Sequence, residues 1–504
     1  MTNKIRRIVI VGGGTAGWMA AASFAKFLQH SDYTIELIES DEIGTIGVGE
    51  ATIPPIVSFN RTLQIDENEF IRATQATFKL GIEFVDWFRP GHRYFHPFGQ
   101  YGVEMQGIGF HHFWLRHIAS GGNRSHDSFN SCAMAALHGR FARPQPAERS
   151  PLPPINYAYH FDAGLYGKFL RRFAERLGAR RLEGRIVQVK QSAENGNIES
   201  VVLADGREVV GDFFIDCSGF RGLLIEQALH AGYEDWSRWL PCDRAVAVPC
   251  DRSEATTPFT RSTATEAGWQ WRIPLQHRTG NGYVYCSAYL NDDEAARLLL
   301  SRLDGAARAD PRPLRFTTGR RREVWKNNCV ALGLASGFIE PLESTSIHLV
   351  QSGIARLLFM FPADSDIDPA TIAKYNEMCR LEMEEIRDFL LLHYKATERD
   401  DTPFWRHCRS MELTDSLRER WEMYQRTANI VVALEDLFKE SSWFAVFAGQ
   451  GVEPTGYHPF ANIVSDEELQ RRLDLISADV MKRVSTLPPH DEYIRQHCAA
   501  PGVG

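Results

Sequence analysis

The sequence predicts an α/β protein whose opening segment builds a parallel sheet. Three observations support this class. The Ile/Val-rich run Arg7–Val11 is typical of a buried strand, a glycine turn leads into a helix over residues 15–28, and Tyr33–Glu39 is a second strand. This strand–helix–strand order predicts parallel pairing with a right-handed crossover.

The turn between the first strand and the first helix carries the pattern Gly-x-Gly-x-x-Gly. Its first glycine permits the tight turn, its second lets a pyrophosphate approach the backbone, and its third allows the helix to pack on the strand. An acidic residue at the end of the second strand is placed to bind ribose hydroxyls, which favours FAD or NAD over NADP. We therefore expect a Rossmann-like dinucleotide site formed by Gly12, Gly14, Thr15, Ala16, Gly17 and Glu39.

Two later strands favour FAD over NAD. Asp212–Asp216 and Asn328–Leu332 are apolar runs that each lead into a turn of small residues. Flavoproteins of the aromatic-hydroxylase type commonly carry such strands, which return to the same cofactor, although an ordinary strand-to-loop turn explains either stretch alone equally well. The second turn would place Gly333 and Leu334 at the cofactor. Because only one Gly-x-Gly-x-x-Gly is present, reduction of the flavin by an outside source is favoured.

The rest of the chain predicts two parts. We expect strands over Arg185–Gln191 and Ile198–Leu203, a β-rich region over 244–289 with antiparallel pairing across Thr279–Gly282, and a loop over Ala142–Pro154. The expected C-terminal helices are Ala370–Tyr394, Asp415–Thr427 and Ser465–Ser485, the last with a capping box at its start. These elements suggest an FAD-binding module with inserted β-rich segments over 1–368 and a mainly helical part over 369–504 that packs over it and completes the substrate site.

Composition limits the partners. The net charge is −8 and no Lys/Arg-rich run occurs, so a nucleic-acid partner has little electrostatic support. The nine cysteines are dispersed without a CxxC pair, which is typical of reduced thiols and argues against a metal site. No stretch approaches the roughly 20 apolar residues of a membrane span. We expect a cytoplasmic protein with no membrane partner, and a homodimer is the default oligomeric state.

Four further motifs occur along the chain, and as a set they are typical of one protein family. They are Gly47–Thr52, Phe78–Gly81 with Lys79 inside it, the W-x-W-x-I-P run within Gly268–Pro274, and Pro341–Ser346. With the N-terminal glycines, this set resembles the flavin-dependent tryptophan/indole halogenase family. The resemblance runs from about residue 5 to about residue 350 and is looser beyond.

The resemblance implies an FAD-dependent, monooxygenase-like enzyme. Reduced FAD from a separate, transient flavin reductase, oxygen and chloride or bromide would generate hypohalous acid for electrophilic halogenation. Lys79 would hold the oxidised halogen, and Glu343 beside it would polarise the halogen or take up the arene proton. Trp269 and Trp271, two residues apart on a strand, point to one face and would keep organic substrate away from the flavin. The flavin-contacting strap would include Gly49, Glu50, Ala51 and Thr52, and the halide site Thr345 and Ser346, where family members often have glycine at the latter position.

The substrate residues are expected in two places. His96 and Phe98 match an H-x-F pair that flanks the indole in family members, although core packing explains them about equally well. Tryptophan-specific members clamp the amino acid with a tyrosine and a glutamate upstream of a Phe-Trp pair. Here the tyrosine is missing, the glutamate position is Ala433, and Leu437–Phe438 replaces Phe-Trp, so Phe438 would line the site.

Without this clamp, free tryptophan loses charge-assisted contacts, which favours indole or a simple indole derivative. If the alignment of this stretch with tryptophan-specific members contains a gap, Glu435 would instead be the clamp and free tryptophan the substrate. A flavin-dependent aromatic hydroxylase and an FAD-binding protein without activity are the other readings. The tryptophan pair opposes the substrate access to flavin that a hydroxylase needs, and a hydroxylase gives no role to Lys79 or Glu343. The intact Lys79, Glu343 and W-x-W-x-I-P run argue against loss of activity.

Overall fold

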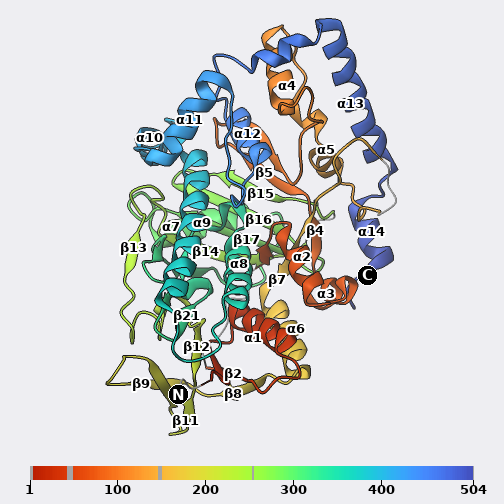
Figure 1. The fold of residues 1–504 in the computed structure, drawn as a ribbon. Helices are drawn as coiled ribbons and strands as arrows, with labels where there is room; N and C mark the ends of the chain where they lie inside the picture. The colour runs from red at the N-terminus through yellow and green to blue at the C-terminus, as the bar shows by residue number, and fades with distance from the viewer. Residues whose placement is uncertain (1–3, 43–48, 146–149, 253–254, 503–504) are drawn as a thin grey trace. The chain divides into compact units, whose positions relative to one another are not determined.

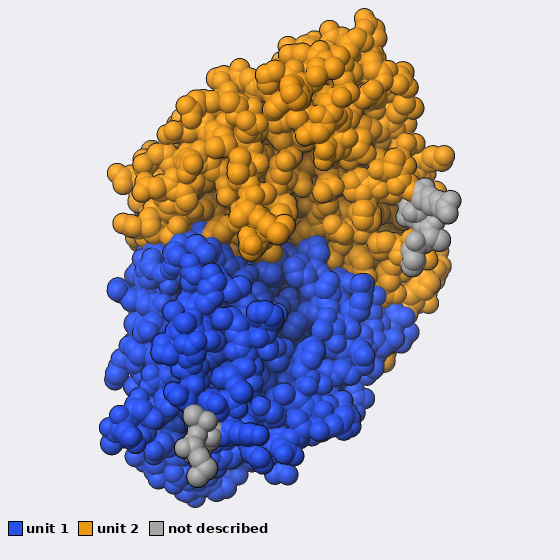
Figure 2. All heavy atoms as spheres, viewed as in Figure 1, with its two compact units in different colours: residues 1–75, 161–237, 315–384 blue, residues 76–160, 238–314, 385–504 orange. Residues whose placement is uncertain are grey.

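The structure is a computed structural model that describes residues 4–42, 49–145, 150–252 and 255–502. It divides into two compact units, coloured separately in Figure 2. Unit 1 comprises residues 1–75, 161–237 and 315–384, and unit 2 comprises residues 76–160, 238–314 and 385–504. The expected division at 368/369 is not a border of these units, because helix α9 (Pro369–Lys395) contributes residues to both. The substrate role expected of 369–504 stays a prediction.

The core of unit 1 is a six-stranded sheet in the order β20-β21-β12-β1-β2-β8. The pairs β1–β2, β1–β12, β12–β21 and β2–β8 are all parallel, and β20 pairs antiparallel with β21. This confirms the parallel sheet and both FAD-type strands. The strands are β1 (Arg7–Val11), β2 (Thr34–Glu39), β8 (Arg180–Glu183), β12 (Phe213–Asp216), β20 (Trp325–Lys326) and β21 (Cys329–Ala331).

Helices and smaller sheets complete unit 1. Helix α1 (Thr15–Phe27) confirms the predicted helix and lies beside α6 (Ala163–Arg176), as Figure 1 shows. An antiparallel sheet of β9 (Ile186–Gln191), β10 (Ile198–Leu203) and β11 (Glu208–Val210) confirms two expected strands. The other elements are β3 (Gly49–Ala51), α2 (Pro55–Thr62), α3 (Glu67–Thr74), β13 (Tyr233–Asp235), β19 (Gly319–Arg321), β22 (Gly337–Phe338), α8 (Ser346–Phe359) and the short 3-10 helices η2 (Gly219–Arg221), η3 (Gly333–Ala335) and η4 (Pro341–Glu343).

Unit 2 is built on a seven-stranded mixed sheet in the order β18-β14-β17-β16-β15-β5-β6. The expected β-rich region is present, but residues 279–282 lie inside β17, and the β16–β17 turn spans 275–278. The strands are β5 (Gly81–Val85), β6 (Arg93–Pro97), β14 (Arg244–Cys250), β15 (Thr260–Ala264), β16 (Gly268–Pro274), β17 (Thr279–Tyr285) and β18 (Arg312–Arg315); the short strand β4 (Thr77–Lys79) pairs separately with β7 (Ala158–Asp162).

The C-terminal helices follow the expected pattern closely. Helices α9, α11 and α13 match the three predicted helices, and the hydroxyl of Ser465 accepts the amide of Glu468 at 3.3 Å, as a capping box requires. None of the described helices is both long enough and apolar enough to cross a membrane. The helical elements of unit 2 are α4 (Phe110–Ala119), η1 (His126–Phe129), α5 (Ser131–Leu137), α7 (Asp292–Ser301), α10 (Pro403–Ser410), α11 (Asp415–Thr427), α12 (Glu440–Gly449), η5 (Pro459–Ile463), α13 (Asp466–Thr486) and α14 (His490–His497).

Candidate active site

The glycine turn of unit 1 has the form that a dinucleotide phosphate needs. A Cβ on Gly12, at φ +110°, would lie 2.2 Å from the carbonyl oxygen of Cys217, and one on Gly17 would lie 1.9 Å from the oxygen of Gly12. Both positions therefore exclude a side chain. A Cβ on Gly14 would meet no atom of the described residues within 4 Å, and no described side chain caps the start of α1 there. The open side of the turn and the uncapped helix terminus fit a pyrophosphate.

Glu39 lies directly against this turn. Its carboxylate accepts from Nε1 of Trp18 at 3.4 Å and from Arg181, and a Cβ on Gly13 would clash with it. The acid is thus held by two donors at the end of β2, next to the turn. This is the place from which an acid reaches the ribose of a dinucleotide.

The exit of β21 returns to the same turn. Gly333 has φ +64°, and a Cβ there would lie 2.8 Å from Cβ of Ala16, so η3 packs closely on the start of α1. Asp216, at the end of β12, accepts amides of Ser218, Leu224 and Ile225 and so shapes its own turn. These contacts bring Gly12, Ala16, Gly17 and Gly333 together in unit 1 and fit FAD.

The predicted flavin strap is described in part. Gly47 and Val48 lie outside the described residues, whereas Gly49, Glu50 and Ala51 form β3. Ala51 and Thr52 are buried, and Glu50 is half-buried. Thr15, also predicted at the cofactor, donates its hydroxyl to the carbonyl of Ala163 at 3.4 Å, and Leu334 is half-buried in η3.

The predicted halide residues lie at the N-terminus of α8. Ser346 is its first residue and Thr345 its N-cap, with no side-chain capping bond. The Thr345 side chain is fully buried, and among the described residues its Oγ1 has no hydrogen-bond partner. A buried hydroxyl beside helix amides that no described side chain caps is a suitable anion site. Glu343 is also fully buried and ends η4, two residues earlier.

Lys79 ends the short strand β4 of unit 2. Its side chain is fully buried, and Nζ lies 5.2 Å from the centroid of the Phe98 ring. A buried ammonium is rare in proteins and needs specific contacts, of which an aromatic face is one. The structure therefore brings together Lys79 and one residue of the predicted H-x-F pair.

His160 supports the same strand through a directional chain of hydrogen bonds. The Thr77 hydroxyl donates to the carbonyl of Pro274 at 2.7 Å, so it accepts from Nδ1 of His160 at 3.1 Å. Nε2 of His160 then accepts from Thr260 at 2.9 Å. Burial lowers the pKa of His160 well below its ordinary value, and the nearby Lys79 lowers it further. A neutral imidazole thus links β4 to the start of β15, and the Thr77 hydroxyl links β4 to the end of the W-x-W-x-I-P strand.

The two other predicted substrate residues meet in an aromatic cluster. The ring of His96 lies 6.2 Å from that of Phe438 and 5.5 Å from that of Phe389. Phe389 stacks on Phe438 at 3.8 Å. Ala433 and Glu435 are exposed on the loop before Phe438. All three side chains are buried and pack on one another, and their contact with a substrate stays a prediction.

Trp269 and Trp271 share a face of β16, as expected from their spacing. Their ring centroids are 6.0 Å apart, and both side chains are buried. Gly282 is the strand partner of Trp271, and a Cβ there would lie 2.0 Å from the indole, so glycine is required. Trp87 packs on Trp269 at 6.4 Å and extends the cluster.

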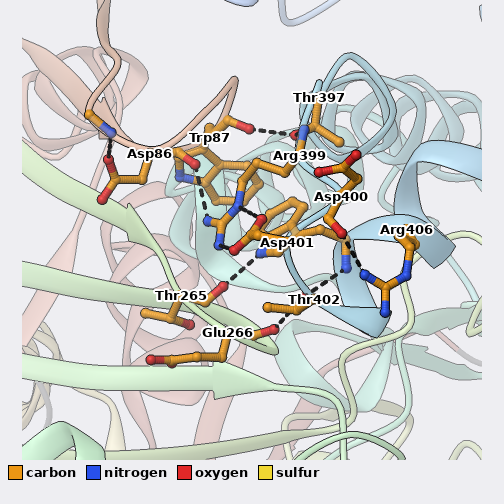
Figure 3. Close-up of polar contacts among 12 residues, drawn as sticks. Asp86, Trp87, Thr265, Glu266, Thr397, Arg399, Asp400, Asp401, Thr402 and Arg406 are labelled. Carbon is orange, nitrogen blue, oxygen red and sulfur yellow. Dashed lines mark hydrogen bonds and ion pairs between the residues drawn. The ribbon is translucent and has the colours of Figure 1, made fainter.

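A segment after α9 holds Trp87 in place (Figure 3). Thr397 donates to the carbonyl of Trp87 at 2.7 Å, and Arg399 donates to the carbonyl of Asp86 at 3.1 Å. Arg399 also forms a two-pronged contact with Asp401 at 2.9 and 2.8 Å. Thr402 bonds the carbonyl of Glu266 at 2.8 Å, which ties the segment to the β15–β16 turn.

Several of these residues were not predicted. Contacts between parts of the chain distant in sequence bring in Trp87, His160, Phe389 and Arg399. Only the apolar face of α9 hinted at Phe389, and that pattern does not separate a site residue from a core residue. Among the described residues, no group of three or more His, Cys, Asp or Glu is arranged to hold a metal ion.

The fold and the glycine turn define an FAD-dependent enzyme, and comparisons with known proteins specify the class. A family model described as tryptophan halogenase matches residues 7–466. A flavin-dependent halogenase structure from Xanthomonas campestris is 51% identical, covers 99% of both chains and superposes with a TM-score of 0.96. One from Brevundimonas sp. BAL3 is 43% identical, with 98% of this chain and 99% of that chain covered and a TM-score of 0.94. Tryptophan 7-halogenase RebH of Lentzea aerocolonigenes is 35% identical over 98% of this chain and 99% of its own length.

The chain belongs to the tryptophan halogenase family. This confirms the resemblance, the predicted fold class and the enzyme class, an FAD-dependent halogenase with halide as co-substrate. The family implies an indole-like substrate.

Proposed function

We propose that the chain makes hypohalous acid from chloride or bromide and directs it, through Lys79, to an indole-like aromatic substrate. Bound FAD, reduced by a separate flavin reductase, supplies the chemistry by which oxygen oxidises the halide. Gly12, Gly14, Gly17, Glu39 and the neighbouring Thr15, Ala16, Gly333 and Leu334 would hold the cofactor with the strap at Gly49–Thr52. The observation that carries the proposal is the fully buried side chain of Lys79, whose Nζ lies 5.2 Å from the centroid of the Phe98 ring.

Lys79 would act as a hydrogen-bond donor to the oxidised halogen species. The aromatic carbon bonds to the halogen while the halogen–oxygen bond breaks, and the oxygen leaves as water after taking a proton from the ammonium. The ring proton passes to a carboxylate, the role we assign to Glu343. Burial supports both assignments, because a charged hydrogen bond is stronger where water is excluded.

Thr345 and Ser346 would bind the halide. The buried Thr345 hydroxyl lacks a partner among the described residues, and the backbone amides at the start of α8 are not capped by a side chain. Serine in place of the family's usual glycine keeps its amide, so the site retains that donor. Trp269 and Trp271 would keep the organic substrate from the flavin.

Indole or a simple indole derivative is the substrate class that unit 2 favours. The rings of His96, Phe389 and Phe438 provide flat apolar surfaces and no charge for an α-amino acid. Ala433 occupies the glutamate position, and Glu435 is exposed to solvent. A free tryptophan zwitterion would therefore lack the paired contacts that hold it in tryptophan-specific members.

Product mass spectrometry tests this function. The protein is supplied with FAD, a flavin reductase, NADH, oxygen and either bromide or chloride, with indole and tryptophan in parallel. We expect a halogen isotope pattern on indole and not on tryptophan. Halogenated tryptophan alone would refute the substrate assignment, and a hydroxylated product would refute halogenation.

Lys79→Ala tests the catalytic assignment. The variant should lose halogenation entirely while retaining FAD binding, measured by flavin absorbance after gel filtration. Lys482→Ala, which removes an exposed lysine of the same unit, is the matched control and should keep full activity. Retained halogenation in Lys79→Ala would refute the role of Lys79.

A further inference from the structure

The strand that carries Lys79, β4, has only three residues. It needs support beyond its pairing with β7. β4 pairs antiparallel with β7, with Thr77 opposite His160 and Lys79 opposite Ala158. Thr77 and Lys79 therefore point to one face, and Phe78 points to the other. Whatever fixes Phe78 also fixes the backbone from which Lys79 projects.

The backbone amide of Phe78 donates to a histidine of the C-terminal helix. Its nitrogen lies 3.1 Å from Nε2 of His490, and Nδ1 of the same ring lies 2.9 Å from the carbonyl oxygen of Thr256. An amide can only donate and a carbonyl can only accept, so the imidazole carries its proton on Nδ1 and is neutral. Burial lowers the pKa of His490, which favours this neutral form.

The same helix also encloses the Phe78 side chain. The Phe78 ring stacks on Phe141 with the ring centroids 4.0 Å apart, and it contacts Tyr493 of α14 edge-on at 5.7 Å. Helix α14 thus contacts β4 twice, with an imidazole on the backbone and an aromatic ring on the side chain.

Helix α14 has its own anchors, so its position does not depend on Phe78. The amide of His490 donates to the carbonyl of Gly139 at 2.9 Å. The carboxylate of Asp491 accepts the amide of Thr256 at 3.1 Å and lies 3.5 Å from Arg252. A helix fixed at its first turn can hold a short strand in register.

We propose that His490 is a positioning residue for halogenation: its neutral imidazole accepts the Phe78 amide and so holds Lys79 in place. His490 lies beyond residue 466, outside the part of the chain that matches the family model. The proposal rests on the function proposed above for Lys79. Reactive groups displaced by even 1 Å can lose on the order of 100-fold in rate, so a positioning residue has a measurable effect.

Two substitutions separate the Phe78 bond from the rest of the His490 environment. In His490→Gln the amide oxygen reaches the place of Nε2 and can accept the Phe78 amide. In His490→Asn the shorter side chain can keep the Thr256 contact in place of Nδ1 but cannot reach Phe78. Arg495→Ala, an exposed change on the same helix, is the control.

Hydrogen exchange gives a readout that does not require the cofactor. By mass spectrometry, peptides covering residues 76–80 should exchange about tenfold faster in His490→Asn and at the parental rate in His490→Gln and Arg495→Ala. This result would tie the Phe78 amide to the His490 acceptor.

Activity with indole and bromide then tests the consequence for Lys79. We expect kcat for His490→Asn to fall about tenfold while KM for indole changes less than about twofold, because the aromatic cluster is untouched. More hypobromous acid should escape to a thiol or taurine trap per brominated product. His490→Gln should restore kcat and the low escape.

Parental kcat in His490→Asn, or equal losses in the Asn and Gln variants, would overturn the proposal. Failure of the function proposed for Lys79 can be distinguished from failure of the His490 proposal, because the former would appear as retained halogenation in Lys79→Ala. In that case the exchange experiment would still report the His490–Phe78 bond, but the bond would have no catalytic lysine to position and the inference would fall.

Discussion

The carboxylate of Glu385 accepts the backbone amide of Phe438 at 3.3 Å, and a second oxygen accepts that of Leu437 at 3.4 Å. The acid therefore holds the residue whose ring stacks on Phe389 in the aromatic cluster. Burial, and secondarily the negative charge of Asp436, raise the pKa of Glu385 to about 8. At neutral pH the native protein keeps this carboxyl largely protonated, whereas the unfolded chain releases the proton.

Glu385→Gln should change the pH dependence of stability. Because the native pKa of about 8 exceeds the ordinary value of 4.5, the parent loses stability as pH rises between these values, at up to about 1.4 kcal/mol per pH unit. The glutamine does not titrate, so the free energy of unfolding of the variant should rise relative to that of the parent from pH 5 to pH 8. Above pH 8 this difference should stay constant. Urea unfolding at pH 5, 7 and 9 measures this difference. A constant offset between the two proteins would contradict the assigned protonation.

Gly14→Ala should weaken FAD binding without harming the fold. Within the described part of the chain, the added methyl meets no atom within 4 Å, but it enters the space that we assign to the pyrophosphate. We expect the Kd for FAD to rise about tenfold, equivalent to about 1.4 kcal/mol. Gly12→Ala should instead lower the melting temperature, because its methyl would clash with the Cys217 carbonyl. Gly167→Ala in α6, where no atom of a described residue lies within 4 Å, is the control and should leave FAD binding unchanged. Unchanged FAD affinity in Gly14→Ala would place the phosphate elsewhere.

The strand–helix–strand opening and the C-terminal helices were predictable because their signals are local. Three local signals each act within a few residues: the Ile/Val-rich run Arg7–Val11, the glycine spacing of the turn and the Ser465–Glu468 capping box. The position of the β16–β17 turn was harder to predict, because the glycines in Thr279–Gly282 resemble those of a turn when only the local sequence is considered. In the structure Gly282 serves to admit the Trp271 ring from the neighbouring strand.

The surroundings of the predicted site residues could not be inferred in the same way. Lys79 and Phe98 were found by their motifs, but their contact depends on how β4 and β6 are placed in unit 2. His160 and His490 are common residue types without a local motif, and they reach β4 across 83 and 412 positions of sequence. Tertiary packing, rather than any periodic pattern, selects such residues.

Thr345→Val should raise the KM for halide and stabilise the protein. The substitution keeps the side-chain shape, removes one donor from the proposed halide site, and removes a buried hydroxyl that has no partner among the described residues. We expect KM for bromide to rise about tenfold and the free energy of unfolding to rise by about 1 kcal/mol. Thr318→Val is a matched control, since that hydroxyl is also buried and has no partner within the described chain, outside the predicted site. It should gain stability and keep its KM; a similar KM change in both variants would remove the halide role of Thr345.

Arg399→Lys should loosen the support of the tryptophan cluster. The arginine is buried, bonds Asp86 and Asp401 together, and lies 4.7 Å from the Trp405 ring, whereas lysine lacks the planar fork needed for these contacts. We expect a loss of roughly 1–3 kcal/mol in stability. Arg406→Lys, at an exposed residue of helix α10, should change stability by less than about 0.5 kcal/mol.

The product distribution decides whether this support serves the reaction. Trp87 packs on Trp269, so a mobile Trp87 should weaken the barrier proposed between substrate and flavin. Below the melting temperature, Arg399→Lys should give a larger share of hydroxylated indole relative to brominated indole than Arg406→Lys. Destabilisation with an unchanged product ratio would limit Arg399 to a structural role and would argue against shielding by Trp269.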